Sequence, residues 1–188
     1  MQNKIKRIIE ESQGVKASLL SKEYIDLIEK AAKNITGALG KGGKVIVFGN
    51  GGSASDSQHM VAELVGRFKK ERAAVPAISL STNTSTITAL SNDYGYDISF
   101  KRQIEALGKK DDIAIGISTS GKAKNVIEAL LKAKERGLAT IALTGKAGGR
   151  VKDIADLSIV VNSDDTARIQ EAHILIIHIL CELVENEL

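Results

Sequence analysis

Residues 44–66 constrain the fold of this chain more than any other segment. They begin with an apolar, largely β-branched run at 45–48, which predicts a buried strand. Three glycines follow within four positions and allow a sharp turn, and the helical spacing of apolar residues starts near Ala54. We expect Ser53 and Ser55 to cap this helix. A strand, a Gly/Ser-rich turn and a helix N-terminus favour an anion site, because free N–H groups and the positive end of the helix dipole point into the turn.

The same design recurs further along the chain. A predicted strand at 112–117 runs into a Ser-Thr-Ser-Gly turn at 118–121 and then into a helix at 123–136. In a parallel sheet two such turns lie side by side at the carboxyl edge, where open α/β sheets bind ligands. Hydroxyl-rich turns with backbone N–H groups suit a phosphomonoester held by neutral donors. The alternative is that both segments are only tight turns and helix caps.

Strands alternate with helices along the chain, which predicts one α/β domain spanning 1–188. Its sheet is expected to be mostly parallel, with helices on both faces and right-handed crossovers. Two N-terminal helices at 1–13 and 17–39 precede the first strand. Residues 92–95 and 144–149 are expected to be turns. The expected strands are 45–48, 77–80, 112–117, 138–143 and 157–161, and the later helices are expected at 87–91, 98–107, 123–136 and 167–185, the last capped by Asp165 or Thr166.

Charge and composition exclude several classes of function. Lys and Arg outnumber Asp and Glu by 26 to 23, and a net charge of +3 gives no support for nucleic-acid or membrane binding. The basic positions between 67 and 72 are expected to form a solvated helix end. Cys181 is the sole cysteine, so no intrachain disulfide is possible, which fits a reducing cytoplasm. The run 174–181 is apolar almost all round but far shorter than the ~20 residues of a membrane span, so we expect a helical subunit interface there.

Acid–base and metal-ligating residues gather on two predicted helices. His59 and Glu63 are four residues apart, hence on one face of the helix that follows the first turn. Gln170, His173 and His178 lie on the last helix, and imidazoles with a carboxylate suit Zn²⁺ or a similar divalent ion. Gln170 and His178 are about 12 Å apart along that helix, so ligands from two subunits would reach one ion more easily. The alternatives are an exposed His59–Glu63 pair and a core histidine at His178.

Five motifs together resemble the phosphoheptose isomerase family, which has the sugar-isomerase (SIS) fold. The motifs occur in the family's order, and the resemblance covers nearly the whole chain. They are Gly-Asn-Gly-Gly-Ser at 49–53, His-x-x-x-Glu at 59–63, Asn-Asp-Tyr-Gly at 92–95, Gly-Ile-Ser-Thr-Ser-Gly at 116–121 and Thr-Ala-Arg-Ile-Gln-Glu-Ala-His at 166–173.

The resemblance implies a flavodoxin-like, three-layer sandwich with a five-stranded parallel sheet between helices. It also implies a homotetramer with active sites between subunits, in which residues 1–40 form a helical extension used in oligomerisation. The reaction would convert D-sedoheptulose 7-phosphate to D-glycero-D-manno-heptose 7-phosphate through an enediol. This would be the first step toward nucleotide-activated heptose for surface glycans, and it would take place in the cytoplasm.

The resemblance further implies a set of site residues. Glu63 and His178 would be the catalytic base and acid. One zinc ion per subunit would be bound by His59, Glu63, Gln170 and His178. The sequence departs from the family at Lys122-Ala123 and at Ala167, which bears on substrate preference. The substrate would contact Asn50, Gly51, Gly52, Ser53, Glu63, Asn92, Asp93, Ser118, Thr119, Ser120 and Gln170, with the phosphate on Ser53, Ser118, Thr119 and Ser120.

The expected chemistry explains why these residue types are needed. Moving a carbonyl from C2 to C1 requires a proton taken from one carbon and returned to its neighbour, which a carboxylate such as Glu63 can do. A divalent cation or a protonated imidazole would stabilise the charge that builds on the enediol oxygen. The alternatives are a non-catalytic SIS protein that binds the replication initiator, a sugar-phosphate sensor, and an isomerase of pentose or hexosamine phosphates. The ligand set favours an enzyme, because a binding module does not need it.

Overall fold

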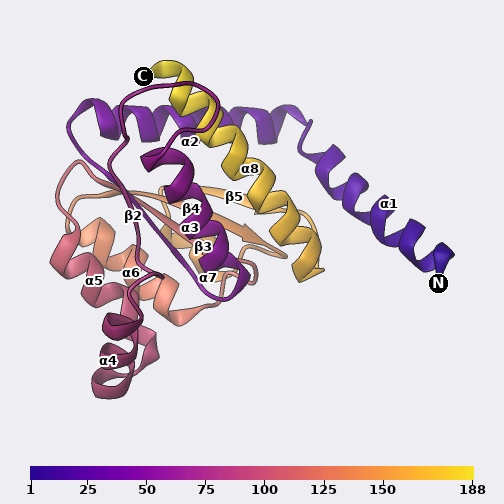
Figure 1. Ribbon diagram of the computed structural model, residues 1–188. Coiled ribbons are helices and arrows are strands. Elements are labelled where there is room, and N and C mark those ends of the chain that lie inside the picture. The colour runs from indigo at the N-terminus through magenta and orange to yellow at the C-terminus, as the bar shows by residue number, and fades with distance from the viewer.

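The chain folds into a three-layer α/β sandwich around one parallel sheet (Figure 1). The computed structural model describes residues 1–188. The sheet has five strands in the order β2-β1-β3-β4-β5, and every neighbouring pair is parallel. The predicted fold class is therefore confirmed. The strands are β1 (Val45–Gly49), β2 (Ala77–Ser79), β3 (Ile113–Ser118), β4 (Ala139–Gly145) and β5 (Leu157–Val161).

Alternation along the strands separates two apolar cores, one on each face of the sheet. In β1, Val45 and Val47 belong to the core on one face, and Ile46 and Phe48 belong to the core on the other. Strands of this kind are apolar on both faces because helices cover both sides of a parallel sheet. The helices are α1 (Gln2–Ser18), α2 (Lys22–Gly40), α3 (Gly52–Val65), α4 (Thr84–Tyr94), α5 (Ser99–Leu107), α6 (Lys124–Glu135), α7 (Gly149–Ile154) and α8 (Thr166–Glu187), with a 3₁₀ turn at Tyr96–Ile98.

Two helices extend beyond the sandwich. Figure 1 shows α1 reaching out to the N-terminus on one side and α4 protruding on another. Neither has a buried residue, and Ile5, Ile8 and Ile9 of α1 are exposed. The predicted N-terminal helical pair is confirmed, although α1 is longer than expected. The use of residues 1–40 in oligomerisation stays a prediction.

Several predicted element boundaries and caps differ from the structure, because they are set by backbone conformation. Residues 92–94 are not a turn but the end of α4, which stops at Gly95 because that residue takes φ 89°. The turn expected at 144–149 is confined to 146–148, since β4 runs through Gly145 and α7 begins at Gly149. The cap of α3 is Gly51 with φ 57°, rather than a serine side chain.

The basic positions 67–72 do not form a helix end. They lie in the 66–76 loop, which joins α3 to β2. Arg67 and Lys69 are exposed as expected, but Arg72 packs against the last turn of α3. There its Nη2 donates to the Glu63 carbonyl over 2.8 Å and its Nη1 to the Leu64 carbonyl over 2.9 Å. The loop is therefore attached to α3 by a charged side chain.

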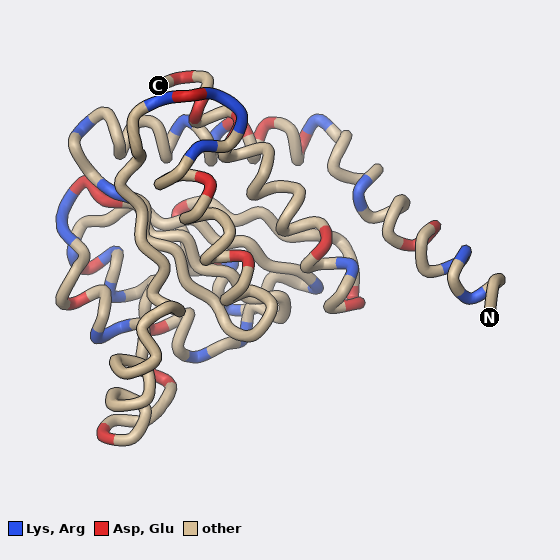
Figure 2. Tube along the Cα trace, in the orientation of Figure 1, with Lys and Arg blue, Asp and Glu red and all other residues tan.

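Helix α8 is covered largely by its own chain. Asp165 caps it as predicted, since its Oδ1 accepts from the N–H groups of Ala167 and Arg168. Helices α2 and α3 pack along α8, in which Cys181 is buried. Burial raises the pKa of the Cys181 thiol to about 12. The apolar run therefore does not by itself require a subunit interface, and that interface stays a prediction. None of the helices, α8 included, combines the length and apolar character that a membrane crossing requires. Along the helices, basic and acidic positions are interspersed (Figure 2).

His173 joins α8 to the sheet from inside the core. The side chain is fully buried, and its Nε2 donates to the Thr144 carbonyl over 3.0 Å. Burial lowers the pKa of His173 from its ordinary value of 6.5 to about 4, although the hydrogen bond to Thr144 acts in the opposite direction. The imidazole is therefore neutral in the folded chain at neutral pH.

We expect His173→Gln to flatten the acid side of the stability profile. A histidine with a pKa of 6.5 when unfolded and about 4 when folded contributes fully above pH 6.5, and this contribution is lost as the pH falls toward 4. Over that window the wild type should lose about 3 kcal/mol of unfolding free energy more than the variant, which keeps a donor but does not titrate. Urea unfolding across the window measures the difference, and parallel profiles would contradict the assignment.

Candidate active site

The turn after β1 is shaped by close approaches that only glycine permits. A Cβ on Gly49 would lie 2.9 Å from the Ile117 carbonyl oxygen. A Cβ on Gly52 would lie 2.3 Å from Nε2 of Gln170 on α8. The end of β1 therefore lies directly against β3, and the first turn of α3 lies directly against α8. Ser53 is buried in that first turn, at 3% exposure.

The turn after β3 lies beside the first one, as predicted. Gly49 pairs with Ile117 in the sheet, so the two strand ends are neighbours at one edge. Ser118 is buried, and Thr119 and Ser120 are half-buried. Gly121 takes φ 65°, and a Cβ there would lie 1.8 Å from the Gly148 carbonyl oxygen. The turn that follows β4 therefore packs directly against the turn that follows β3. Sequence reasoning did not predict this contact.

The Asn50 side chain is hydrogen-bonded within the protein. Its Nδ2 donates to Oδ1 of Asn125 over 2.9 Å, and its Oδ1 accepts from Nδ2 of Asn125 over 2.9 Å. The Tyr96 hydroxyl also donates to Oδ1 of Asn50, over 2.7 Å. Both polar groups of the Asn50 side chain are thus engaged inside the protein. In this structure the side chain ties the β1 turn to the start of α6, and its expected contact with substrate stays a prediction.

Three potential ligand groups converge between α3 and α8. Nε2 of His59 lies 3.1 Å from Oε1 of Glu63 and 3.0 Å from Nε2 of His178. A single ring nitrogen offers either one proton or one lone pair, so Nε2 of His59 cannot satisfy both neighbours at once. The structure therefore brings together three of the four predicted metal residues. The two alternatives left open by the sequence were an exposed His59–Glu63 pair and a core histidine at His178. Neither describes this arrangement.

The spacing of these atoms fits a divalent cation. All three ligand atoms lie within 4.8 Å of one another. Ligands bound to tetrahedral zinc at about 2.0–2.1 Å lie roughly 3.3 Å apart. The observed His59–His178 and His59–Glu63 separations are close to this value, so the donor set suits zinc. Gln170 lies at the beginning of α8 against Gly52, and its part in a metal site stays a prediction.

Comparisons with known proteins agree with this geometry. The family model of the SIS domain matches residues 10–145. The phosphoheptose isomerase of Aquifex aeolicus (strain VF5) is 54% identical over 186 residues, which cover 99% of this chain and 97% of the relative. The phosphoheptose isomerase of Helicobacter pylori (strain P12) is 50% identical over 181 residues, or 96% of this chain and 93% of the relative. The chain belongs to the phosphoheptose isomerase family.

Solved structures of the phosphoheptose isomerase family have the same fold. The Francisella tularensis enzyme superimposes with a TM-score of 0.95 at 38% identity, and the match covers 98% of both chains. The Neisseria gonorrhoeae enzyme gives a TM-score of 0.93 at 40% identity, again over 98% of both chains. The chain is accordingly a sugar-phosphate isomerase.

Asp56 is a buried carboxyl near His59 that the sequence reasoning did not single out. It lies on α3 one turn before His59, and its Oδ2 is buried without a hydrogen-bond partner. Burial raises the pKa of Asp56 to about 6, while the nearby His59 acts to lower it. The spacing of apolar residues around Asp56 does not distinguish it from the exposed polar residues beside it on α3. Its burial depends on tertiary packing, which local sequence does not reveal.

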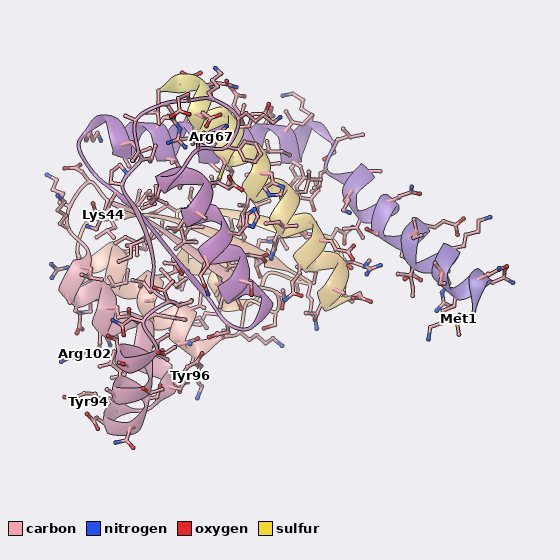
Figure 3. The ribbon with its side chains drawn as sticks, viewed as in Figure 1. Met1, Lys44, Arg67, Tyr94, Tyr96 and Arg102 are labelled. Carbon is pink, nitrogen blue, oxygen red and sulfur yellow. The ribbon has the colours of Figure 1, made fainter.

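Asn92 and Asp93 lie away from the His59 cluster within one chain. Both are exposed at the end of α4, where Nδ2 of Asn92 donates to Oδ1 of Asp93 over 2.9 Å. Figure 3 shows the neighbouring Tyr94 at the tip of α4, at the opposite end of the molecule from Arg67 in the 66–76 loop. Arg102 packs over the Tyr94 ring with its Cζ 5.3 Å from the ring centre. A single chain therefore does not bring these two predicted substrate contacts to Glu63.

We expect Asn125→Ala to destabilise the fold, because it removes the acceptor of Asn50 Nδ2 and one of the two donors to Asn50 Oδ1. The loss should be about 1–3 kcal/mol of unfolding free energy, the cost of stranding partly buried hydrogen-bonding groups. The control is Tyr96→Phe, which removes one hydroxyl at a water-accessible position and should cost less. Urea unfolding compares the two, and an Asn125→Ala protein as stable as the wild type would show that this tie has no structural role.

Proposed function

We propose that this protein converts D-sedoheptulose 7-phosphate to D-glycero-D-manno-heptose 7-phosphate. The observation that carries the proposal is the position of Glu63. Its Oε1 lies 3.1 Å from Nε2 of His59, close to His178. It belongs to α3, the helix whose first turn forms one of the two serine-lined turns. The names of the phosphoheptose isomerases reported above support the choice of a seven-carbon sugar phosphate. The product would then supply nucleotide-activated heptose for surface glycans, in the cytoplasm.

The two turns would bind the phosphate and orient the sugar. Backbone N–H groups at the start of α3 and the hydroxyls of Ser53, Ser118, Thr119 and Ser120 are donors suited to a phosphomonoester. Asn50, Gly51 and Gly52 would line the sugar beside them. Because the phosphate is bound at the far end of the substrate, C1 and C2 are held in a defined position. Phosphate binding thus orients the reacting carbons.

Glu63 would carry the proton between C1 and C2. With Oε1 facing His59, Oε2 remains for the substrate C–H bond. Glu63 takes the proton from one carbon and returns it to the neighbouring carbon, and the enediol forms and collapses between these steps. His178 would act as the general acid that exchanges protons with the substrate oxygens.

We also propose one zinc ion per subunit, bound by His59, Glu63, Gln170 and His178. When bound, the ion supplies positive charge near the substrate oxygens, where negative charge develops. Gln170 would reach it with its amide oxygen after turning away from Gly52. In the proposed homotetramer the sites lie between subunits, and Asn92 and Asp93 on the protruding α4 would reach the site of a neighbouring subunit.

A non-catalytic protein that binds the replication initiator is the alternative from another class. The reported relatives and solved structures are all named as phosphoheptose isomerases. A binding module does not need a carboxylate and two imidazoles within 4.8 Å of one another. Both points favour the enzyme.

We expect Glu63→Gln to lose turnover and keep substrate affinity. Removing a general base lowers kcat by about 10²–10⁴-fold, whereas the phosphate turns are untouched. The assay incubates the purified protein with sedoheptulose 7-phosphate and follows the aldose, and calorimetry on the variant measures binding. The matched control is Glu71→Gln on the exposed 66–76 loop, which should behave as wild type. Near-normal turnover by the Glu63 variant would end the assignment.

We expect the metal to depend on His59 and His178 but not on His173. Removing a direct ligand should weaken zinc binding by at least about tenfold, because even the partners of metal ligands matter by 10–100-fold. Metal analysis of the purified proteins and zinc titration by calorimetry compare His59→Ala and His178→Ala with His173→Gln. Equal zinc content in all three would remove the metal proposal while leaving the isomerase proposal open to its own assay.

A further inference from the structure

A buried carboxylate on α8 holds the 66–76 loop above the site. The Glu185 side chain is 2% exposed. Its Oε2 accepts from the N–H of Phe68 over 2.9 Å, and its Oε1 accepts from the N–H groups of Lys69 over 2.8 Å and of Lys70 over 2.7 Å. Three successive N–H groups pointing at one carboxylate form an anion-binding concavity built by the backbone. The figures show this loop passing over the C-terminal end of α8 (Figure 1, Figure 2).

Arg72 completes this attachment on the side of α3. Its Nε lies 3.3 Å from Oε2 of Glu185, and its Nη2 donates to the carbonyl of Glu63. Burial on its own would raise the pKa of Glu185, but the three backbone N–H groups and the Arg72 charge hold it below its ordinary value. The carboxylate is therefore ionised, and it links the ends of the two helices that carry Glu63 and His178.

The loop places an aromatic ring on the catalytic histidine. Phe68 stacks on His178 with ring centres 5.6 Å apart and planes 25° apart. On its other side His178 faces His59, with the two Nε2 atoms 3.0 Å apart. His178 lies about two turns before Glu185 on α8. The backbone of residue 68 is thus held by Glu185 while its side chain fixes the plane of His178.

A buried charge of this kind favours one arrangement of the loop. Taking a carboxylate out of water is costly, and the cost is offset only while all its hydrogen bonds keep good geometry. By contrast, Glu182 on the same helix reaches the same loop through an exposed ion pair with Nζ of Lys69, at 2.7 Å. Exposed pairs of this type contribute little and tolerate other geometries. Of these two carboxylates on α8, Glu185 is therefore the one that fixes the backbone at Phe68.

We propose that Glu185 is a positioning residue of the isomerase site, which acts by holding Phe68 against the His178 imidazole so that Nε2 of His178 points toward His59 and Glu63. The predicted effect of Glu185 on kcat rests on the proposed function, since it requires turnover of the heptulose phosphate. The predicted effect of Glu185 on the stacking of Phe68 and His178 does not, because the stacking exists without substrate.

The first measurement follows the imidazole C–H resonances of the chain's three histidines by NMR. Protons above an aromatic face are shielded, so loss of the stacking moves the His178 resonances downfield. Glu185→Gln and Phe68→Leu should both produce this shift and leave the resonances of His173 unmoved. Glu182→Gln, the matched control, should leave the His178 resonances in place. The protein is used as purified, and assignment uses a His178→Gln variant.

The second measurement is turnover of sedoheptulose 7-phosphate. A reacting group displaced by about 1 Å can cost 10²-fold in rate, so we expect kcat to fall about 10- to 100-fold in Glu185→Gln with KM within about twofold. Phe68→Leu should give a similar loss. Because both act through one contact, the double variant should lose less than the product of the two single effects. Phe68→Tyr, which keeps the ring, should retain most of the activity.

Each outcome decides the proposal. An unmoved His178 signal in Glu185→Gln, a fall in kcat equal to that of Glu182→Gln, or fully multiplicative losses in the double variant would overturn it. If Glu185→Gln does not fold, Phe68→Leu against Phe68→Tyr still decides whether the ring on His178 supports turnover. A wild type that does not isomerise the heptulose phosphate would defeat the proposed function, while the NMR comparison would still decide whether Glu185 holds Phe68 on His178.

Discussion

The packing of α3 against α8 is the interaction on which the site depends. The two helices run side by side from the β1 turn, where a Cβ on Gly52 would lie 2.3 Å from Gln170, to the 66–76 loop, where Glu185 accepts three backbone N–H groups. Between these ends His59 meets His178 at 3.0 Å. A larger residue at position 52 would displace the Gln170 side chain from the first turn of α3. The glycine at this position therefore determines where a proposed metal ligand lies.

Around this helix pair, the structure uses charges that are buried but partnered. Glu185 and Arg72 hold the loop, and Lys44 pairs with the fully buried Asp112 at the opposite edge of the sheet. Asp56 is different, because its Oδ2 has no partner and burial raises its pKa to about 6. Partnered charges fix geometry, whereas an unpartnered carboxyl beside the site is costly for the fold.

Sequence reasoning predicted the fold more completely than the site. Residues 157–161 form the strand expected of them, and Asp165 caps α8 as its chemistry predicts. His59 and Glu63 lie on one helical face because their spacing of four requires it. Phe68, Asn125 and Glu185 were missed, since each acts through a partner more than 70 residues away in the chain, as the separations of 75 between Asn50 and Asn125 and 117 between Phe68 and Glu185 show. The expected solvation of Arg72 was also wrong, because its side chain packs against the Glu63 and Leu64 carbonyls of α3 and against Glu185 of α8.

The sequence by itself determined the order of strands and helices, the glycine and serine turns, and the helical face that carries His59 and Glu63. These follow from local periodicity and backbone conformation, which neighbouring residues set. Only the tertiary structure decided that His178 meets that pair within a single chain, that Asn50 is tied to Asn125, and that a carboxylate at position 185 orders the loop over the site. Contacts of that kind depend on how helices pack across the sheet, and packing is determined by the whole core rather than by any one segment.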